Sequence, residues 1–369
     1  MSTSDQVPAD TVAQQRDAFT ERLLRSVSGA FDIFSIYIGD RLGFYRALAD
    51  GGPLTSTDLA ARTETDERYA REWLEQQTVA GILTVDDEDL HAAARHFRLP
   101  PGHVEPLLDR DSLNYIAPLP RLIAGCVRPL ATLLEAYRTG AGVPFSEYGS
   151  DMREGQADIN RPAFLHQLAQ EWLPAMPDVH TRLLADPPAR VADIGCGCGW
   201  SSIGIAQGYP NVRMDGFDLD EPSIESAREN ARQHGVADRA QFHVRDGGDP
   251  APAGQFDLVT AFECVHDMTD PVAALRTMRR LAGEDGTVLI VDERVGDSFS
   301  AEGNDVEWMM YGWSILHCLA VGRVEPPAAG TGTVMRADTL RRYALEAGFS
   351  TINVLPIDNY FFRFYQLHP

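Results

Sequence analysis

A glycine-rich segment between a predicted strand and a predicted helix carries the clearest chemical signal in the sequence. Gly195, Gly197 and Gly199 alternate with two cysteines, and Asp193 stands two positions before the first glycine. Glycines at alternate positions let the backbone turn tightly and approach a ligand without an intervening Cβ. Dinucleotide-binding loops use the spacing G-x-G-x-x-G to hold a pyrophosphate. Asp193 would repel a pyrophosphate, so the loop predicts a ligand with an ammonium or sulfonium group.

Two further carboxylates follow the next two predicted strands. Asp218 ends the second strand, 19 residues after Gly199, where it can accept hydrogen bonds from both hydroxyls of a ribose. Asp246 ends the third strand and can accept a hydrogen bond from an adenine amino group. One such acid alone is commonly a solvated loop residue, whereas three at successive strand ends favour a joint binding site. The same cofactor site is expected to include Leu219, Gly247 and Glu263.

A candidate base follows the fourth predicted strand. His266 is placed there, and a histidine with an ordinary pKa of about 6.5 suits proton abstraction near neutral pH. The alternative is a structural histidine or one that shields the cofactor. Asp267 could orient the imidazole, although adjacent side chains often point apart. His317 is a second candidate base.

A run of large apolar side chains lies beyond the fifth predicted strand. Met309, Met310 and Trp313 belong to this run, and a soft aromatic wall of this kind could bury a flat hydrophobic acceptor. The same pattern is also typical of an ordinary core helix. Phe145 and Tyr148, from an earlier segment, could cover the site. These five residues are the predicted substrate contacts.

Residues 186–369 predict the scaffold that would bring these strand ends together. Strands and helices alternate, which is typical of a doubly wound, Rossmann-like α/β sheet. Such sheets bind ligands at the carboxyl ends of their strands. Seven strands are expected, the last of them antiparallel, at 190–194, 212–217, 240–244, 256–262, 286–292, 351–356 and 360–367. Helices are expected at 200–208, 222–233, 271–281 and 337–347.

Residues 18–110 predict a winged-helix domain. Thr55 and Asp58 have the spacing of a capping box, Asp66 is a suitable N-cap for a second helix, and Gly81 would end that helix. A hairpin is expected to follow, with its first strand at 82–85 and its return from residue 90. The apolar face of the second helix is expected to contain Tyr69, Ala70, Trp73, Leu74 and Gln77.

The charge of this domain argues against DNA as its partner. The tip of the predicted wing is Asp86-Asp87-Glu88-Asp89, and between Glu21 and Arg110 there are 10 Arg against 16 acidic residues. Binding to phosphates requires clustered cations. We therefore expect a homodimer formed through this domain, and no nucleic-acid partner.

The remaining segments complete the expected organisation. Residues 1–17 are expected to be a disordered tail, and residues 111–185 a helical connector or lid. Breaks are expected at 140–144 and 148–150, and a helix is expected to open at Asn160-Arg161-Pro162. A chain of 369 residues suits more than one domain.

Three segments of the predicted sheet resemble the ordered motifs of class I S-adenosylmethionine-dependent methyltransferases. They are 193–199, 216–220 and 256–259. With its winged-helix domain, nearly the whole chain is similar to a group of actinobacterial methyltransferases related to dimeric small-molecule O-methyltransferases. The resemblance implies S-adenosylmethionine as cofactor, with its methionine part at the three loop glycines, its ribose at Asp218 and its adenine at Asp246.

The resemblance extends to the candidate base. His266-Asp267 resembles the His-Asp-Trp of plant-type O-methyltransferases, whose histidine is the general base, but Met268 replaces the tryptophan. We therefore expect methyl transfer to a small aromatic or hydrophobic metabolite of secondary metabolism, at oxygen. Transfer to nitrogen or carbon without a base, a non-catalytic ligand-sensing transcriptional regulator, and a nicotinamide dehydrogenase are the alternatives.

Net charge, cysteine content and hydropathy limit the possible partners and cofactors. The net charge of −22 suits a cationic ligand better than a nucleic acid. Five cysteines without framework spacing suit reduced thiols in the cytoplasm. Cys196 and Cys198 lack a second ligand pair at metal-binding spacing, so no metal is expected. No apolar run is long enough for a membrane span.

Overall fold

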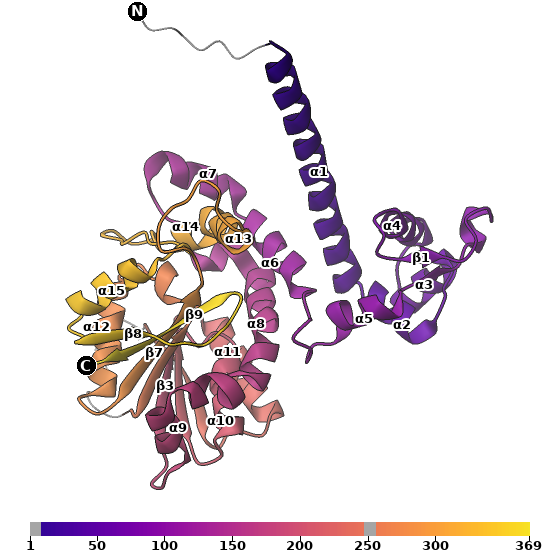
Figure 1. Ribbon diagram of the computed structural model, residues 1–369. Coiled ribbons are helices and arrows are strands. Elements are labelled where there is room, and N and C mark those ends of the chain that lie inside the picture. Colours follow the sequence, from indigo (N-terminus) through magenta and orange to yellow (C-terminus); the bar gives the residue numbers. More distant parts are fainter. Residues whose placement is uncertain (1–8, 247–255) are drawn as a thin grey trace, which may run out of the picture. The chain divides into compact units, whose positions relative to one another are not determined.

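The computed structural model describes residues 9–246 and 256–369 (Figure 1). The chain divides into two compact units, Met1–Ile123 and Ala124–Pro369. This division falls inside the segment 111–185 that we expected to form a separate connector.

The first unit has the predicted helices and wing, but the return strand of the hairpin begins at Phe97 rather than near residue 90. Thr55 and Asp58 form the expected capping box at the start of α3, and the side chain of Asp66 accepts the N–H groups of Arg68 and Tyr69 at the start of α4. The wing is short, with Thr84 paired to Arg98 in an antiparallel hairpin. The elements are α1 (Ala9–Arg41), α2 (Phe44–Gly51), α3 (Ser56–Thr63), α4 (Glu67–Val79), β1 (Thr84–Val85), η1 (Ala92–Ala94), β2 (Phe97–Arg98) and α5 (Pro101–Leu108).

Two other expectations for this unit are wrong. Helix α1 begins at Ala9, so residues 9–17 are helical rather than disordered. Residues 9–28 contain neither glycine nor proline and are rich in good helix formers, which accounts for the helix. Tyr69 is 80% exposed, whereas Ala70, Trp73, Leu74 and Gln77 are buried, because the buried face of α4 begins one residue later than predicted.

The second unit contains the predicted seven-stranded sheet. Its order is β5-β4-β3-β6-β7-β9-β8, and the last strand, β9, is antiparallel to both of its neighbours. Ile194 lies opposite Phe217 on one side and Ala261 on the other, so successive strand ends meet at one edge. The strands are β3 (Arg190–Ile194), β4 (Arg213–Asp218), β5 (Ala240–Val244), β6 (Leu258–Phe262), β7 (Thr287–Glu293), β8 (Thr351–Val354) and β9 (Phe362–His368).

Helices cover both faces of this sheet, as expected for a doubly wound fold (Figure 1). One core packs α10 (Trp200–Gly208) and α11 (Glu221–Gln233) against the sheet, and the other packs α12 (Pro271–Ala282) and α15 (Ala337–Glu346). The remaining segments are α6 (Pro118–Val127), α7 (Leu130–Thr139), η2 (Phe145–Tyr148), α8 (Gly149–His166), η3 (Leu168–Trp172), η4 (Leu173–Ala175), α9 (Pro177–Leu184), η5 (Val265–Asp267), α13 (Asp305–Trp313), η6 (Ser314–Cys318) and α14 (Leu319–Val321).

Helix α8 differs from the prediction. It begins at Gly149 and continues through Pro162 to His166, so no helix opens at Asn160. Packing against α10 accounts for this continuity: a Cβ added to Gly204 would stand 2.1 Å from the carbonyl oxygen of Phe164. Such close contact outweighs the cost of one proline inside the helix. No helix within the described residues is long and apolar enough to span a membrane.

Candidate active site

The predicted glycine loop leaves the end of β3 with three residues in the left-handed region. Gly195, Gly197 and Gly199 have φ values of 69°, 49° and 83°. A Cβ on Gly195 would lie 2.7 Å from Sγ of Cys264, and a Cβ on Gly199 would lie 2.8 Å from the ring of Phe242. A Cβ on Gly197 would meet nothing within 4 Å. The outer glycines therefore permit packing within the protein, and the middle one leaves open space for a ligand.

Asp193 lies in a different setting from the one expected. It is 1% exposed, and its carboxylate accepts hydrogen bonds from the hydroxyls of Ser201 (2.6 Å), Ser202 (2.7 Å) and Thr260 (2.8 Å). Burial raises the pKa of Asp193, and the three hydroxyl donors oppose that effect. These contacts tie the first turn of α10 to β3 and β6. Asp193 thus braces the loop through these three hydroxyl groups.

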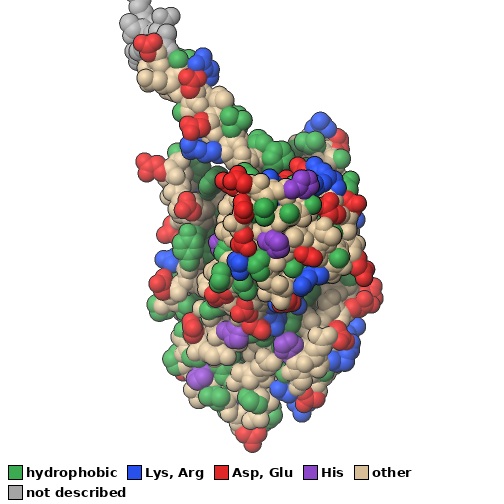
Figure 2. Space-filling model, turned by 90° about the vertical axis from the view of Figure 1, so that its right-hand side faces the viewer, with side chains coloured by type: hydrophobic (Ala, Val, Ile, Leu, Met, Phe, Trp, Pro, Cys, Tyr) green, Lys and Arg blue, Asp and Glu red, His purple; other side chains and the backbone are tan. Residues whose placement is uncertain are grey.

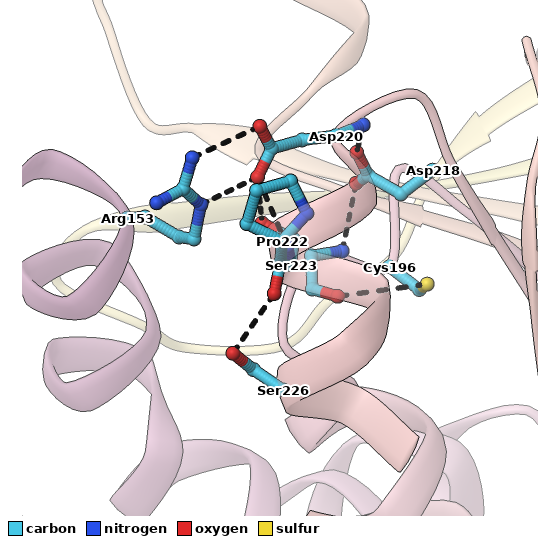
Figure 3. A network of polar contacts seen from close by, with 8 residues as sticks. Arg153, Cys196, Asp218, Asp220, Pro222, Ser223 and Ser226 are labelled. Atoms are coloured by element: carbon cyan, nitrogen blue, oxygen red, sulfur yellow. Dashed lines mark hydrogen bonds and ion pairs between the residues drawn. The ribbon is translucent and has the colours of Figure 1, made fainter. Parts of the chain in front are cut away.

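Asp218 holds the loop from the neighbouring strand, as Figure 3 shows. Its Oδ2 accepts the N–H of Gly197 at 2.8 Å, and its Oδ1 accepts the N–H of Asp220 at 2.9 Å. Each oxygen keeps a further lone pair for a ligand. Burial raises the pKa of Asp218. Asp220 caps α11 through Ser223 and forms an ion pair with Arg153 of α8, so α8 is anchored beside the loop.

The other predicted cofactor residues of this edge are more exposed. Leu219 is 66% exposed, and Asp246 is exposed just after β5. The N–H of Arg245 donates to the carbonyl of Asp218 at 2.8 Å, which keeps the ends of β4 and β5 together. Gly247 lies outside the described residues.

Glu263 follows β6 and departs from regular strand geometry. Its φ is 50°, and its N–H donates to the carbonyl of Val291 at 2.8 Å. Its Oε2 accepts a hydrogen bond from Gln156 of α8 at 3.4 Å. Burial raises the pKa of Glu263 to about 7.

His266 is buried between β6 and β7. Its Nδ1 lies 2.9 Å from Oδ1 of Asp292 and 3.2 Å from Oε2 of Glu293. Burial lowers the pKa of His266, but the two carboxylates outweigh burial and hold it well above the ordinary value. Burial also raises the pKa of Glu293 well above its usual range, so Asp292 is the better anionic partner.

The sequence did not reveal Asp292 and Glu293 as partners of the histidine. They are the last two residues of β7, and only the strand order brings them beside the end of β6. Two consecutive acids at the end of a predicted strand were the available signal. They also account for the orientation that we had expected Asp267 to provide.

Asp267 lies in a second group around the same imidazole. Ligand atoms of His266, Asp267 and Cys318 lie within 4.8 Å of one another, as do those of His266, Asp292 and Glu293. Burial raises the pKa of Asp267 to about 6. The residue types in both sets are those of metal ligands, although their spacing in the sequence does not predict a metal site. The hydrogen bond between His266 and Asp292 accounts for the second set without an ion.

His317 occupies the π-helical turn η6 and is 7% exposed. Its ring makes edge contacts with Phe145 and Tyr148, at centroid distances of 5.7 Å and 4.5 Å. Burial lowers its pKa to about 3, with help from the charge of His266. An imidazole with so low a pKa is a weak base, so His317 is a poorer candidate than His266.

The five predicted substrate contacts fall into two groups. Phe145 and Tyr148 surround His317, but Tyr148 is fully buried, and its hydroxyl donates to the carbonyl of Leu316 at 3.1 Å. Burial and this hydrogen bond give Tyr148 a packing role, and its contact with a substrate stays a prediction. The second group belongs to a small cluster on the second half of α13, in which Met310 is buried and Met309 and Trp313 are partly buried against the cluster.

The sequence matches two known protein families. The family described as methyltransferase domain matches residues 185–320, and the family described as Rv2258c-like winged HTH domain matches residues 30–109. Residues 185–320 therefore form a methyltransferase domain. The glycine loop, Asp218, Glu263 and His266 all lie within the matched segment.

Curated relatives match this chain over part of their own length. Ajmaline N-methyltransferase of Rauvolfia serpentina is 30% identical over 105 residues, which is 28% of this chain and 36% of the relative. The 27-O-demethylrifamycin SV methyltransferase of Amycolatopsis mediterranei is 27% identical over 172 residues, which is 46% of this chain and 57% of the relative. The first three relatives are matched over 36%, 44% and 36% of their own length.

Solved structures share the fold of the methyltransferase domain and of the first unit. Mitomycin 7-O-methyltransferase MmcR has a TM-score of 0.71 at 21% identity, covering 96% of this chain and 99% of that chain. Human N-acetylserotonin methyltransferase, in complex with S-adenosylmethionine, has a TM-score of 0.61 at 17% identity, covering 100% of this chain and 99% of that chain. Both share the fold of this chain over nearly its whole length.

Proposed function

We propose that this chain transfers a methyl group from S-adenosylmethionine to an oxygen of a small aromatic or hydrophobic metabolite, with His266 as the base. The observation that carries this proposal is the buried His266, paired with Asp292 at the strand end beside the glycine loop. Small-molecule O-methyltransferases among the structural neighbours support it, as does the resemblance of His266-Asp267 to a known catalytic pair.

The residues of the loop fit the cofactor. A Cβ on Gly197 would fill space that is open in this structure, so its glycine suits close approach of the methionine part. Asp218 has lone pairs for ribose hydroxyls, and we assign Asp246 to the adenine and Leu219 to the same cofactor site. S-adenosylmethionine supplies the electrophilic methyl group on a positively charged sulfur. The chain supplies the pocket, the orientation and the base.

His266 would take the proton from the acceptor hydroxyl. Asp292 holds Nδ1 and stabilises the imidazolium that forms, which is the usual task of a carboxylate behind a catalytic histidine. Because two carboxylates raise the pKa of His266, the base must first lose its proton. The proposal therefore requires activity to rise with pH above the ordinary range of histidine.

The test uses methyl-labelled S-adenosylmethionine and a panel of simple phenols and hydroxyquinones, with products identified by mass spectrometry. We expect O-methyl ethers, and we expect His266→Ala to lower kcat by about a hundredfold or more while affinity for the cofactor is kept. Full turnover by His266→Ala would contradict the role of the base and favour transfer to nitrogen or carbon.

Transfer to nitrogen or carbon is the second candidate, because the curated relatives include an N-methyltransferase. A non-catalytic regulator is a third, because residues 30–109 match a winged HTH family. The acidic wing tip, Asp86 to Asp89, disfavours phosphate binding. A gel-shift experiment with genomic fragments separates the regulator from the enzymes.

We also propose that the chain forms a homodimer through its first unit and works in the cytoplasm. Apolar side chains that are at least half exposed occur along α1: Val12, Phe19, Leu23, Leu24, Val27 and Phe31. In Figure 2, green hydrophobic side chains lie among charged ones in the segment below the grey terminus. Burial of these side chains against a second copy would remove them from water. The five cysteines are all free, which suits a reducing compartment.

A further inference from the structure

Glu263 has a backbone conformation that its residue type disfavours. Among the described residues only Glu64 and Glu263 combine a side chain with a positive φ, at 54° and 50°. Glu64 closes the end of α3, a usual place for the left-handed conformation. Glu263 instead follows a buried strand, where such strain is most often kept for a function.

One oxygen of the Glu263 carboxylate is hydrogen-bonded, and the other is buried without a partner among the described residues. Its Oε2 accepts a hydrogen bond from Gln156, and Asn160, one turn further along α8, also interacts with it. Its Oε1 is buried and has no hydrogen-bond partner within residues 9–246 and 256–369. A buried carboxylate oxygen without a partner is costly, so a ligand is the natural partner.

The position of Glu263 borders the glycine loop. Ala261 lies opposite Ile194 in the sheet, so the residues after each strand run side by side. The neighbouring Cys264 donates its thiol to the carbonyl of Ile194 at 3.3 Å, and its Sγ fills the space that a Cβ on Gly195 would need. Glu263 is therefore held next to the loop that would receive the methionine part of the cofactor.

The surroundings of this carboxylate favour a cation. Burial and the charge of Asp292 raise the pKa of Glu263, while His266, Gln156 and Asn160 lower it. Burial therefore outweighs the three groups that lower the pKa of this carboxyl, which is about 7. The methionine part of S-adenosylmethionine has two positive groups, the sulfonium and the α-ammonium.

We propose that Glu263 is the counter-ion of a positive charge on the methionine part of S-adenosylmethionine, held in place by Gln156 and by the strained backbone after β6. This role rests on the proposed use of that cofactor and adds to it. Either positive group, the sulfonium or the ammonium, would form an ion pair with the carboxylate. The experiment below distinguishes the two.

Calorimetry on the full chain measures the affinity of three ligands for the wild type and for Glu263→Gln. S-adenosylmethionine carries both positive groups, S-adenosylhomocysteine carries only the ammonium, and 5′-methylthioadenosine carries neither. If Glu263 contacts the sulfonium, the variant should bind S-adenosylmethionine about tenfold more weakly and the other two ligands as the wild type does. An ammonium contact predicts similar losses for S-adenosylmethionine and S-adenosylhomocysteine, with methylthioadenosine unchanged.

Unchanged affinities for all three ligands would overturn the proposal, and so would an equal loss for all three. Glu284→Gln is the matched control, because Glu284 is exposed before β7, at the opposite end of that strand from Glu293, and should alter none of the affinities. If Glu263→Gln fails to fold, Glu263→Gly removes the carboxylate and relieves the positive φ, and the same outcomes apply. If the wild type binds S-adenosylmethionine and the variant binds it with the same affinity, only the counter-ion role of Glu263 is refuted. A wild-type chain that does not bind it refutes the proposed function as well.

Discussion

At the scale of residues, the decisive feature is the charge on His266. Asp292 and Glu293 surround its Nδ1 at 2.9 Å and 3.2 Å, and together they favour the imidazolium. The folded-state pKa is therefore above the value of about 6.5 expected for the unfolded chain. The ion pair stabilises the fold fully below that unfolded value, and this contribution is lost as pH rises through the folded pKa.

Under the proposed mechanism, methyl transfer requires the neutral imidazole of His266, so the raised pKa shifts activity to higher pH. We expect the rising limb of the pH–kcat profile to lie above pH 6.5 in the wild type and to move to lower pH in Asp292→Asn, because the anion that holds the proton is gone. The maximal kcat should also fall, since the imidazolium loses its partner in the transition state. Asp215→Asn is a suitable control, because Asp215 pairs with Arg190 and His243 far from His266. Coincident limbs in the wild type and Asp292→Asn would contradict a role for His266 as the base.

The sequence predicts those site residues that directly follow a recognisable strand. Gly195, Asp218 and His266 each follow a recognisable strand, and parallel strands bring their ends to one edge. The partner Asp292 could not be found in this way, because its contact depends on the order of strands in the sheet. The setting of Asp193 was also inaccessible, because it depends on hydroxyls from α10 and β6 that converge only in three dimensions.

At the scale of elements, local signals located most helices and strands to within two residues. Strand β3 and helix α10 have the expected bounds, because glycines and polar turns separate their apolar runs. Helix α8 was missed because its continuity through Pro162 comes from packing against Gly204. Propensity alone favours a break at a proline, and tertiary contact overrode it.

Substitutions in the glycine loop can distinguish Gly197, beside which we propose that the ligand binds, from Gly195, which packs against Cys264. Gly197→Ala adds a Cβ with no neighbour within 4 Å, so the cost to stability should be the strain of a positive φ, about 1–2 kcal/mol. Affinity for S-adenosylmethionine should nevertheless fall by at least tenfold. Gly195→Ala adds the same strain and a clash with Cys264, so the loss in free energy of unfolding should be larger, and Gly195→Ala with Cys264→Ala should recover part of it.

Denaturant unfolding and calorimetry on the three variants would measure both quantities. Equal losses of stability in Gly195→Ala and Gly197→Ala would contradict the assigned difference between the two positions. An unchanged cofactor affinity in Gly197→Ala would show that the open space beside it is not used by the ligand.

At the scale of the whole molecule, charge and the exposed helix determine which partners are plausible. The net charge of −22 opposes association with phosphates, yet it also opposes association between two copies at low salt. A homodimer must therefore draw its stability from apolar burial, and α1 offers the side chains for it. Such a dimer should become tighter as salt is raised, because screening reduces repulsion while apolar burial is kept.

This reasoning gives the last prediction. Phe19→Arg with Leu23→Arg places two charges in the apolar stripe of α1, where both side chains are at least half exposed and make no core contact, so the fold should be retained. Light scattering should then find a monomer where the wild type is a dimer. Gln14→Arg is the control, because it adds a cation at an exposed polar position of the same helix. A dimer that survives the double substitution would place the interface elsewhere, and a monomeric wild type at every salt concentration would remove the dimer itself.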